Sequence, residues 1–442
     1  MSGIEKHCYK RYAIQPEWIY TSNQNQDLLD KHTVIINDGL IENIIPSEHF
    51  QRETVEYVFE LHQSLLTPGL INNHTHAAMS FLKGISDDQQ LQDWLEKTIW
   101  PAESKFLSSE LVFDGAQLSC LEMLSSGITT FNDMYFYPDS TARAALNVGI
   151  RANIGLVFMD IKTNYATDFT DYLDKGFFFR DNFRDESLIT TSLAPHAPYT
   201  VNDDSFLKIR TYADQLGLNI HCHIHETDWE IQDGLKNFGM RPIERLEKLG
   251  VLGPDFMGVH CVQMVDSDLS LIEKNQMHVI SCPTSNLKLA SGALPINDII
   301  KKRIGLSIGS DSSASNNKIS ILEDLKLFSL LQRLDKKNDT FLSDKDLIDM
   351  VTINSANALN LSKQIGSIEV GKRADITAFD LSGYKTEPIY NPLSSLIYSG
   401  SSDCVNHVWV DGNLKFSKGM FSNNIDTESI LEKIRLWQKK IK

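Results

Sequence analysis

The sequence lacks the features that mark several classes of protein. Its six cysteines (Cys8, Cys120, Cys222, Cys261, Cys282 and Cys404) form no C-x-x-C pair and no compact spacing, so a disulfide framework is not indicated. We interpret them as buried thiols of a reducing compartment. Basic charge is scarce, because 42 Lys and Arg stand against 58 Asp and Glu, for a net charge of -16. That balance disfavours phosphate backbones and anionic membrane surfaces as partners and favours a small neutral or cationic substrate.

Long apolar runs are absent as well. No stretch comes near the roughly 18 uncharged apolar residues of a membrane span, and MSGIEKHCYKRYAIQPEWIY at the start of the sequence has no apolar segment of the signal-peptide kind. We therefore expect a cytoplasmic protein with neither a membrane nor a nucleic acid as partner. What is present, 42% hydrophobic and 23% charged residues, is typical of a soluble globular chain with a large core.

The order of the apolar runs predicts the fold. From about Leu65, short β-like runs alternate with longer helical stretches, which is the pattern of βα units and a parallel sheet. Eight runs can be placed, the number that closes a (β/α)8 TIM-like barrel. They are one that ends near 76 and then 128–131, 150–157, 188–194, 216–224, 257–259, 279–280 and 306–308.

Both ends of the chain have a different texture of short strands and turns. The run 33–36 is followed by a turn at Asn37-Asp38-Gly39 and a second run at 40–45, and the same texture returns after a helical stretch at 347–361. A chain of 442 residues has room for one smaller domain beside a barrel. We predict an α/β protein whose segments are 1–65, the N-terminal part of a β-sandwich; 66–364, the metal-dependent barrel; and 365–442, the C-terminal part of the sandwich with a terminal helix.

The first chemical signal is His74-Thr-His76 at the end of an apolar strand. Side chains two apart on a strand point to the same side, so both imidazoles can face the barrel axis and share one ion. Taken alone, such a pair would as readily be two surface histidines.

The second signal is His221-Cys-His223-Ile-His225-Glu226. The three histidines fall on one face of a strand, and their spacing does not choose which of them binds a metal. Glu226 is placed to carry a proton beside a metal, although a lone Glu is more often a solvated loop acid.

Two further groups directly follow predicted strands, namely His260 and Asp311. Alone, His260 would more often be a core histidine, and Asp311 would more often be a helix cap. All four signals, however, lie at the C-terminal ends of predicted strands, where barrel enzymes assemble their sites. The sequence has neither the Pro-Cys-x-x-Cys pair of cytidine-type deaminases nor the His-Glu-x-x-His helix of zincins.

With these residues in view, the sequence resembles the amidohydrolase superfamily, and within it the methylthioadenosine/S-adenosylhomocysteine deaminases of the triazine-hydrolase-like group. The resemblance covers essentially the whole chain, and its most specific stretches are 73–80, 94–103, 132–136, 194–199, 223–227, 285–291 and 311–317. It implies an aminohydrolase that converts 5'-methylthioadenosine at C6 to the 6-oxo nucleoside and ammonia. S-adenosylhomocysteine and adenosine are further candidate substrates, and a homo-oligomer is the family-level expectation.

The resemblance also implies a mononuclear metal site. The matching ligands are His74, His76, His223 and Asp311. Zinc fits imidazole and carboxylate ligands best, and iron or manganese would also be accommodated. In binuclear relatives a modified lysine on the fourth strand bridges the ions. We take 150–160 as that strand, and it contains no lysine.

The same resemblance assigns catalysis and substrate binding. The matching catalytic groups are Glu226, His260 and Asp311, and the matching substrate contacts are Glu103, His196, Glu226 and Asp311. Glu103 would accept both ribose hydroxyls. Some members carry arginines after the fourth strand that meet a homocysteine carboxylate. We take 155–161 as the corresponding segment, and it offers apolar residues instead, which favours a neutral thioether substrate.

Two alternatives stay open. One is another ring hydrolase of the same group, such as a triazine chlorohydrolase or a guanine-type deaminase, for which Glu103 would have no diol to hold. The other is a barrel scaffold without catalysis, against which the complete set of candidate metal ligands argues.

Overall fold

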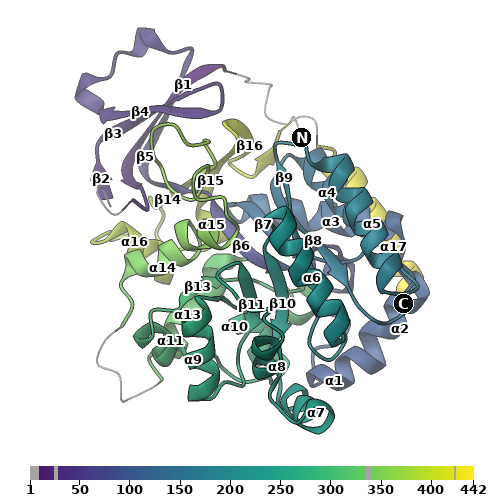
Figure 1. Cartoon of the computed structure of the whole chain (residues 1–442). Coiled ribbons are helices and arrows are strands. Elements are labelled where there is room, and N and C mark those ends of the chain that lie inside the picture. Colours follow the sequence, from purple (N-terminus) through teal and green to yellow (C-terminus); the bar gives the residue numbers. More distant parts are fainter. Residues whose placement is uncertain (1–8, 24–27, 335–340, 423–424) are drawn as a thin grey trace.

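The computed structural model describes residues 9–23, 28–334, 341–422 and 425–442. Eight parallel strands stand side by side in chain order (Figure 1), as the sequence predicts. They are β6 (Leu70–Thr75), β7 (Ile128–Met134), β8 (Arg151–Phe158), β9 (Ile189–Pro195), β10 (Ile220–Ile224), β11 (Phe256–His260), β12 (His278–Ser281) and β13 (Gly305–Ile308). Nearly all of their residues are buried, because helices cover the outside of the barrel and side chains fill its centre.

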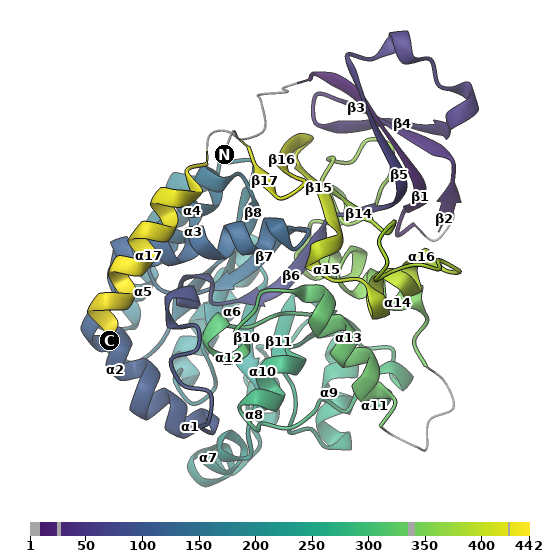
Figure 2. The same cartoon turned by 180° about the vertical axis from the view of Figure 1, so that it is seen from behind.

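Helices follow the strands and form the outer layer (Figures 1 and 2). They are α3 (Ser109–Ser125), α4 (Pro138–Val148), α5 (Phe169–Phe183), α6 (Asp203–Leu216), α7 (Asp228–Phe238), α8 (Pro242–Lys248), α9 (Asp266–Asn275), α10 (Pro283–Lys288), α11 (Ile296–Lys301), α12 (Ser313–Asn316), α13 (Ile321–Gln332), α14 (Asp344–Met350) and α15 (Ile353–Ala358). Between β6 and α3 the chain makes a longer excursion through η3 (Ala77–Leu82), α1 (Leu91–Trp94), the π-helix η4 (Leu95–Ile99) and α2 (Trp100–Phe106).

The barrel closes at its first and last strands. Thr75 of β6 forms a parallel bridge with Asp311, which lies just beyond β13. A Cβ atom on Gly309 would lie 2.6 Å from the Cβ of His74, so the two strands can approach this closely only because residue 309 has no side chain.

Two predictions made along the barrel need correction. The predicted run 216–224 begins too early, because Leu216 ends α6 and β10 starts at Ile220; an apolar helix end and a strand start look alike without a break between them. The fourth barrel strand is β9, not 150–160, which is the third. Since β9 reads ITTSLAP, it also lacks a lysine, and the expectation of one ion does not change.

The two ends of the chain form one mixed sheet beside the barrel. Its strands are β1 (Arg11–Tyr20), β2 (Leu28–Asp30), β3 (His32–Asn37), β4 (Leu40–Pro46), β5 (Tyr57–Pro68), β14 (Ile376–Asp380), β15 (Val405–Val410), β16 (Asn413–Ser417) and β17 (Met420–Phe421). The predicted pairing of the two ends is confirmed, because β5 runs antiparallel to β14. Hydrogen bonds join the strands into one continuous sheet with its own apolar core. The domain boundaries at 65 and 364 stay a prediction.

A buried ion pair ties this sheet to the barrel. Arg151 at the start of β8 donates from Nε to Asp375 Oδ2 at 2.7 Å, and both side chains are almost fully buried. The second oxygen of Asp375 accepts the backbone N–H of Asp411 at 2.7 Å. Asp375, which lies just before β14, therefore contacts both the barrel strand β8 and the turn after β15.

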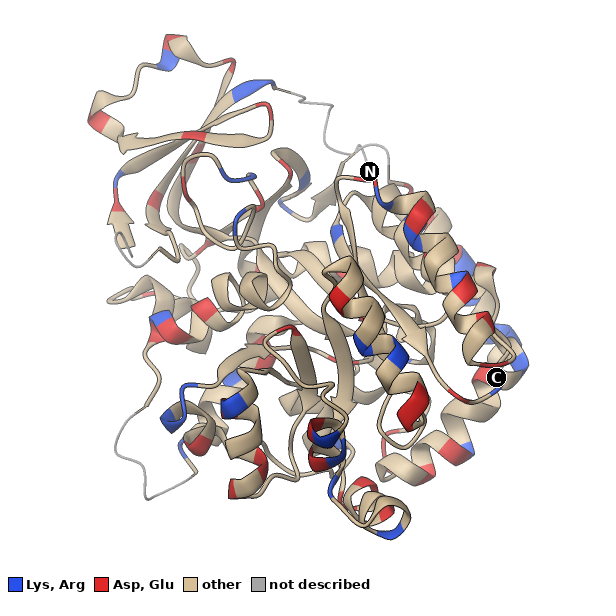
Figure 3. Ribbon diagram, in the orientation of Figure 1, with Lys and Arg blue, Asp and Glu red and all other residues tan. Residues whose placement is uncertain are grey.

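Two further α-helices are α16 (Pro392–Ser394) and the predicted terminal helix, α17 (Thr427–Ile441), which packs on α3. Five cysteines are free and buried, while Cys8 lies outside the described residues. In the part of the chain that the structure describes, no helix is long and apolar enough to cross a membrane. Lys and Arg are interspersed with Asp and Glu over the ribbon seen in Figure 3.

Candidate active site

A cavity opens at the C-terminal ends of the barrel strands, with about 750 Å³ of space between its lining atoms when its open mouth is included. Its lining includes seven of the predicted site residues: His76, Glu103, His196, His223, Glu226, His260 and Asp311. His74 lies beneath this lining and is fully buried. The structure thus brings together residues from the ends of five barrel strands (β6, β9, β10, β11 and β13) and from α2.

Three imidazoles and one carboxylate converge at the bottom of the cavity. Asp311 Oδ1 lies 3.4 Å from His74 Nε2 and 3.3 Å from His76 Nε2. The Nε2 atoms of His74 and His223 are 3.2 Å apart. Burial lowers the pKa of His74 to about 4 and holds that of His223 well below its usual value. Both rings are therefore neutral, which is the form that binds metals.

The environment of His76 tests whether these residues suit a cation. His76 Nδ1 lies 2.5 Å from the carbonyl oxygen of Met134, so it is Nδ1 that carries the hydrogen, and in the neutral ring Nε2 presents its lone pair. That atom faces a carboxylate oxygen of Asp311 at 3.3 Å. Burial acts to lower the pKa of His76, but the neighbouring Asp311 raises it overall, so the position between the two groups suits a positive charge, either a proton or a metal ion. A ligating histidine that donates its other N–H to a carbonyl is typical of metal sites. The donor set therefore fits a divalent ion.

Hydroxyl groups fix the orientation of Asp311. Ser285 Oγ donates to Asp311 Oδ2 at 2.5 Å, and Ser315 Oγ donates to the same oxygen at 3.2 Å, so Oδ1 is left for the histidines. Burial acts to raise the pKa of Asp311, yet the neighbouring His74 and His76 hold it well below the usual value. Asp311 is thus a carboxylate with one oxygen committed to the protein.

The three histidines of β10 and its end have different surroundings. His223 faces the cavity. His221 lies deeper, with Nε2 3.0 Å from His74 Nδ1. His225 points away: its Nε2 accepts the backbone N–H of Ile243 at 3.1 Å, and its Nδ1 lies 3.2 Å from the carbonyl oxygen of Gln263. This arrangement agrees with the expectation, drawn from the resemblance, that His223 is the ligand.

Glu226 and His260 face each other beside the cluster. Their closest atoms, Glu226 Oε2 and His260 Nε2, are 3.6 Å apart. Burial raises the pKa of Glu226, so this carboxyl retains a proton more readily than an exposed one. His260 and Asp311 have positive φ angles of 75° and 60°, a conformation that costs such residues of order 1–3 kcal/mol and is frequent at functional sites.

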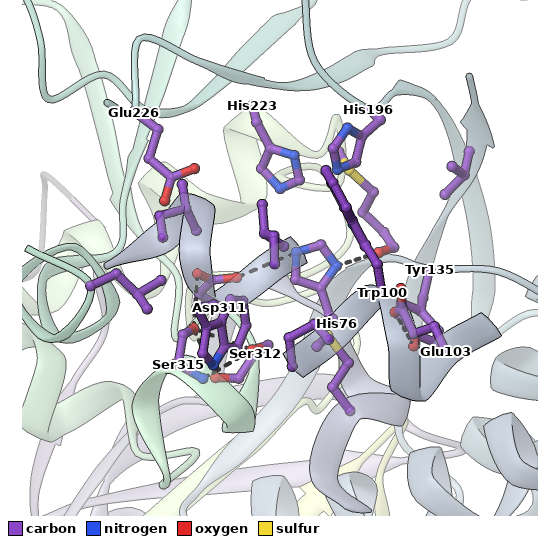
Figure 4. Close-up of a pocket in the computed structure, with 18 of the residues that line it drawn as sticks. His76, Trp100, Glu103, Tyr135, His196, His223, Glu226, Asp311, Ser312 and Ser315 are labelled. Atoms are coloured by element: carbon purple, nitrogen blue, oxygen red, sulfur yellow. Dashed lines mark hydrogen bonds and ion pairs between the residues drawn. The ribbon is translucent and has the colours of Figure 1, made fainter. Parts of the chain in front are cut away.

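Glu103 and Tyr135 lie across the cavity from Glu226, with His76 between them (Figure 4). The Tyr135 hydroxyl donates to Glu103 Oε1 at 2.6 Å. Burial raises the pKa of Glu103 to about 7, although the Tyr135 bond acts in the opposite direction. His196 stands near His223, with ring centroids 5.0 Å apart, and its Nδ1 contacts the Thr200 hydroxyl at 3.0 Å. The cavity thus has a polar group at each side of the cluster.

The outer wall of the cavity is apolar. It is built mainly by the excursion after β6, and its members include Met79, Leu91, Trp94, Leu95, Ile99 and Leu289. Among the described residues that line the cavity there is no Lys or Arg. No sequence pattern indicated this wall, because the helices that carry it are short and one of them is a π-helix. The contacts of Tyr135 with Glu103 and of Ser285 with Asp311 were likewise not predicted.

Comparison with known proteins agrees with the fold. The sequence matches the amidohydrolase family over residues 65–415. It is 40% identical to a 5-methylthioadenosine/S-adenosylhomocysteine deaminase of Saccharophagus degradans, over 97% of this chain and 96% of that protein. It is 34% identical to a 5'-deoxyadenosine deaminase of Methanosarcina acetivorans, over 96% of each.

A solved structure is similar over nearly the whole chain as well. A zinc-bound adenosine deaminase from Xanthomonas campestris superposes with a TM-score of 0.94 at 34% identity, covering 97% of this chain and 98% of that one. The chain therefore belongs to the amidohydrolase family, in its group of 5-methylthioadenosine/S-adenosylhomocysteine deaminases.

Proposed function

We propose that this protein hydrolyses the 6-amino group of adenine nucleosides that carry a small neutral 5' substituent, and that 5'-methylthioadenosine is its preferred substrate. The observation that carries this proposal is the position of Glu103, across the cavity from Glu226 and the histidine cluster. A nucleoside has a ring to be attacked and a diol to be held, and the cavity offers one acidic group for each. The relatives named for deamination of such nucleosides support the same reaction.

For the metal, we propose one zinc ion held by His74, His76, His223 and Asp311. The neutral histidines, the lone pair of His76 aimed at Asp311 and the zinc-bound relative support this choice. When bound there, a divalent ion acidifies water and so supplies the nucleophile near neutral pH. Because β9 carries no lysine that could bridge a second ion, we propose a site with one ion.

The chain's own residues would move the protons. Asp311 and His260 accept and orient the proton of the attacking water, which adds to C6 of the purine. Glu226, whose raised pKa keeps a proton available, donates to N1 and makes C6 more electrophilic. The proton taken from water then goes to the departing amine, and the proton left on the C6 hydroxyl returns to Glu226 as the 6-oxo group forms. Water and the nucleoside thus give the 6-oxo nucleoside and ammonia, with Glu226 protonated again.

The apolar wall supports the choice among substrates. Leu91, Leu95 and Leu289 are among its members, and burial of a methyl group against such a surface is favourable by about 0.8 kcal/mol per carbon. S-adenosylhomocysteine would bring an amino-acid tail whose carboxylate finds no Lys or Arg in the described lining. Desolvation of an unpaired charge is costly, so the neutral thioether is preferred.

The proposal is tested with a panel of substrates on zinc-loaded protein, measuring ammonia release from the nucleosides and guanine and chloride release from the triazine. The panel contains 5'-methylthioadenosine, 5'-deoxyadenosine, adenosine, S-adenosylhomocysteine, guanine and a chlorotriazine. We expect the highest kcat/KM for 5'-methylthioadenosine and none above background for guanine or the triazine. Faster turnover of guanine or the triazine would favour the ring-hydrolase alternative, and a preference for S-adenosylhomocysteine would show that a cation from elsewhere reaches the cavity.

A further inference from the structure

Asn286 makes one side-chain contact with the catalytic cluster. Its Oδ1 lies 2.8 Å from His260 Nδ1, and both residues are almost completely buried. An amide oxygen can only accept a hydrogen bond, so Nδ1 of His260 carries the hydrogen. A neutral imidazole has one N–H, and therefore Nε2 presents its lone pair.

That lone pair points into the site. His260 lines the cavity, and its Nε2 is the atom nearest to Glu226, 3.6 Å from Oε2. In this tautomer Nε2 can accept a proton from water, or a hydrogen bond from a protonated Glu226. In the opposite tautomer Nε2 would carry a hydrogen and could only donate, which would make His260 unfit to accept the proton of the attacking water.

The side-chain nitrogen of Asn286 indicates that the amide at this position does not serve the stability of the fold. Its Nδ2 is buried and has no hydrogen-bond partner among the described residues. A buried donor without a partner is unfavourable by about 1–3 kcal/mol, so an apolar side chain of similar size would suit the fold better. The backbone anchors the residue, since its N–H donates to Cys282 at 3.0 Å and its carbonyl accepts from Ser291 at 2.8 Å.

The preceding residue acts on the other proton acceptor. Ser285 holds Oδ2 of Asp311 at 2.5 Å, and Ser285 and Asn286 are adjacent in α10. A single helical turn therefore contacts both groups that handle the proton of water. We propose that Asn286 is a positioning residue which fixes His260 as the Nδ1–H tautomer with its Nε2 lone pair facing the reacting water. The tautomer follows from the contacts alone, whereas its effect on turnover rests on the proposed function.

The tautomer can be read without substrate. Zinc-loaded protein with ring-15N histidine gives separate signals for protonated and unprotonated ring nitrogens, and the His260 pair is identified by its loss in a His260→Gln variant. We expect a protonated Nδ1 and an unprotonated Nε2 in the wild type, and a mixture of tautomers in Asn286→Leu. A wild-type His260 protonated at Nε2 would overturn the proposal, whatever the enzyme's substrate is.

Kinetics separates positioning from a general structural effect. Asn286→Leu should lower kcat for 5'-methylthioadenosine by about tenfold to a hundredfold, with KM and zinc content unchanged. Asn286→Asp restores an acceptor at the same place and should keep at least about ten times the kcat of Asn286→Leu. Leu287→Ala, on the same helix and at a side chain 42% exposed, is the matched control and should equal the wild type.

Equal losses in the Leu and Asp variants, or a wild-type kcat in Asn286→Leu, would contradict the positioning role. If Asn286→Leu does not fold, Asn286→Ala replaces it, with the same expected direction and with zinc content and thermal unfolding measured alongside. An inactive wild type would instead count against the proposed function and would leave the ring-15N measurement to decide the tautomer.

Discussion

The backbone N–H of Asp311 donates to the carbonyl oxygen of His74 at 3.0 Å. This bond joins the last strand of the barrel to the first, and it also joins two of the proposed metal ligands. Closure of the barrel and assembly of the metal site are therefore the same structural event. A ligand that binds only the folded chain adds to its stability, so removal of the metal should lower the unfolding temperature as well as abolish activity.

The histidines of β10 should respond differently to replacement. His223→Ala is expected to lose zinc and activity together, because it removes a ligand. His221→Ala should still bind zinc but about tenfold to a hundredfold more weakly, because it removes only the partner of His74 Nδ1. His225→Ala should keep the wild-type affinity.

Competition with a chromogenic chelator measures these affinities. His225→Ala is also the control for loss of an imidazole from the same segment, and it should lower thermal stability because the N–H of Ile243 loses its acceptor. Retention of zinc by His223→Ala together with its loss in His221→Ala would show that the ligand has been assigned to the wrong residue.

Glu226→Gln should keep zinc and lower kcat by roughly 10²-fold or more, the scale of a positioned proton donor. The amide has nearly the same size as the carboxyl, so packing should survive. Glu244→Gln, at a half-exposed glutamate paired with Lys248, is the control. Near-normal turnover in Glu226→Gln would remove this residue from the proposed proton transfers.

Activity toward ribosides should depend on the ionisation of Glu103. Burial raises the pKa of this carboxyl to about 7, so it is protonated below that pH and ionised above it. The ionised form accepts hydrogen bonds from both ribose hydroxyls more strongly, because those bonds are then charge-assisted. Between pH values of about 6 and 8, kcat/KM for 5'-methylthioadenosine should therefore rise by about tenfold, the scale of a charge-assisted hydrogen bond.

A 2',3'-dideoxy analogue is the matched substrate control for Glu103. It has no diol, so its kcat/KM should lack this rise and should be nearly the same in Glu103→Ala as in the wild type. Glu103→Ala should lower the riboside's kcat/KM by tenfold to a hundredfold, or about 1.5–3 kcal/mol. Equal losses for riboside and dideoxy analogue would mean that Glu103 does not hold the diol.

Asp375→Ala should destabilise the fold without changing the site directly. It would leave Arg151 buried without its main partner, which typically lowers the free energy of unfolding by about 3–5 kcal/mol. Denaturant unfolding of the zinc-loaded protein measures this change. Asp139→Ala, which breaks an exposed pair with Arg143, should change stability by less than about 1 kcal/mol, and a similar effect of the two variants would contradict the structural role given to Asp375.

Local patterns were enough to predict the barrel and much of the site. Buried parallel strands read as apolar runs, and His74, His223, His260 and Asp311 each end or follow such a run. The fold then brings these residues to one end of the barrel. The resemblance supplied what spacing could not, namely the preference for His223 over His221 and His225.

Other features depend on contacts that sequence patterns do not encode. The partner of Glu103 is Tyr135, 32 residues away, and the partner of His260 is Asn286, 26 residues away. Neither pair has a spacing that a helix or strand would impose. The apolar wall is equally hidden, because Leu91 and Leu289 come from segments that meet only in the folded protein.

The most direct test of the account is the product formed from 5'-methylthioadenosine by zinc-loaded wild-type protein. Mass spectrometry and an ammonia assay on the same sample should find the 6-oxo nucleoside and ammonia in equal amounts, with both absent after chelation of the metal and restored by zinc. Unchanged 5'-methylthioadenosine in the presence of bound zinc, or release of free adenine in place of ammonia, would contradict the claim that this site is a nucleoside deaminase.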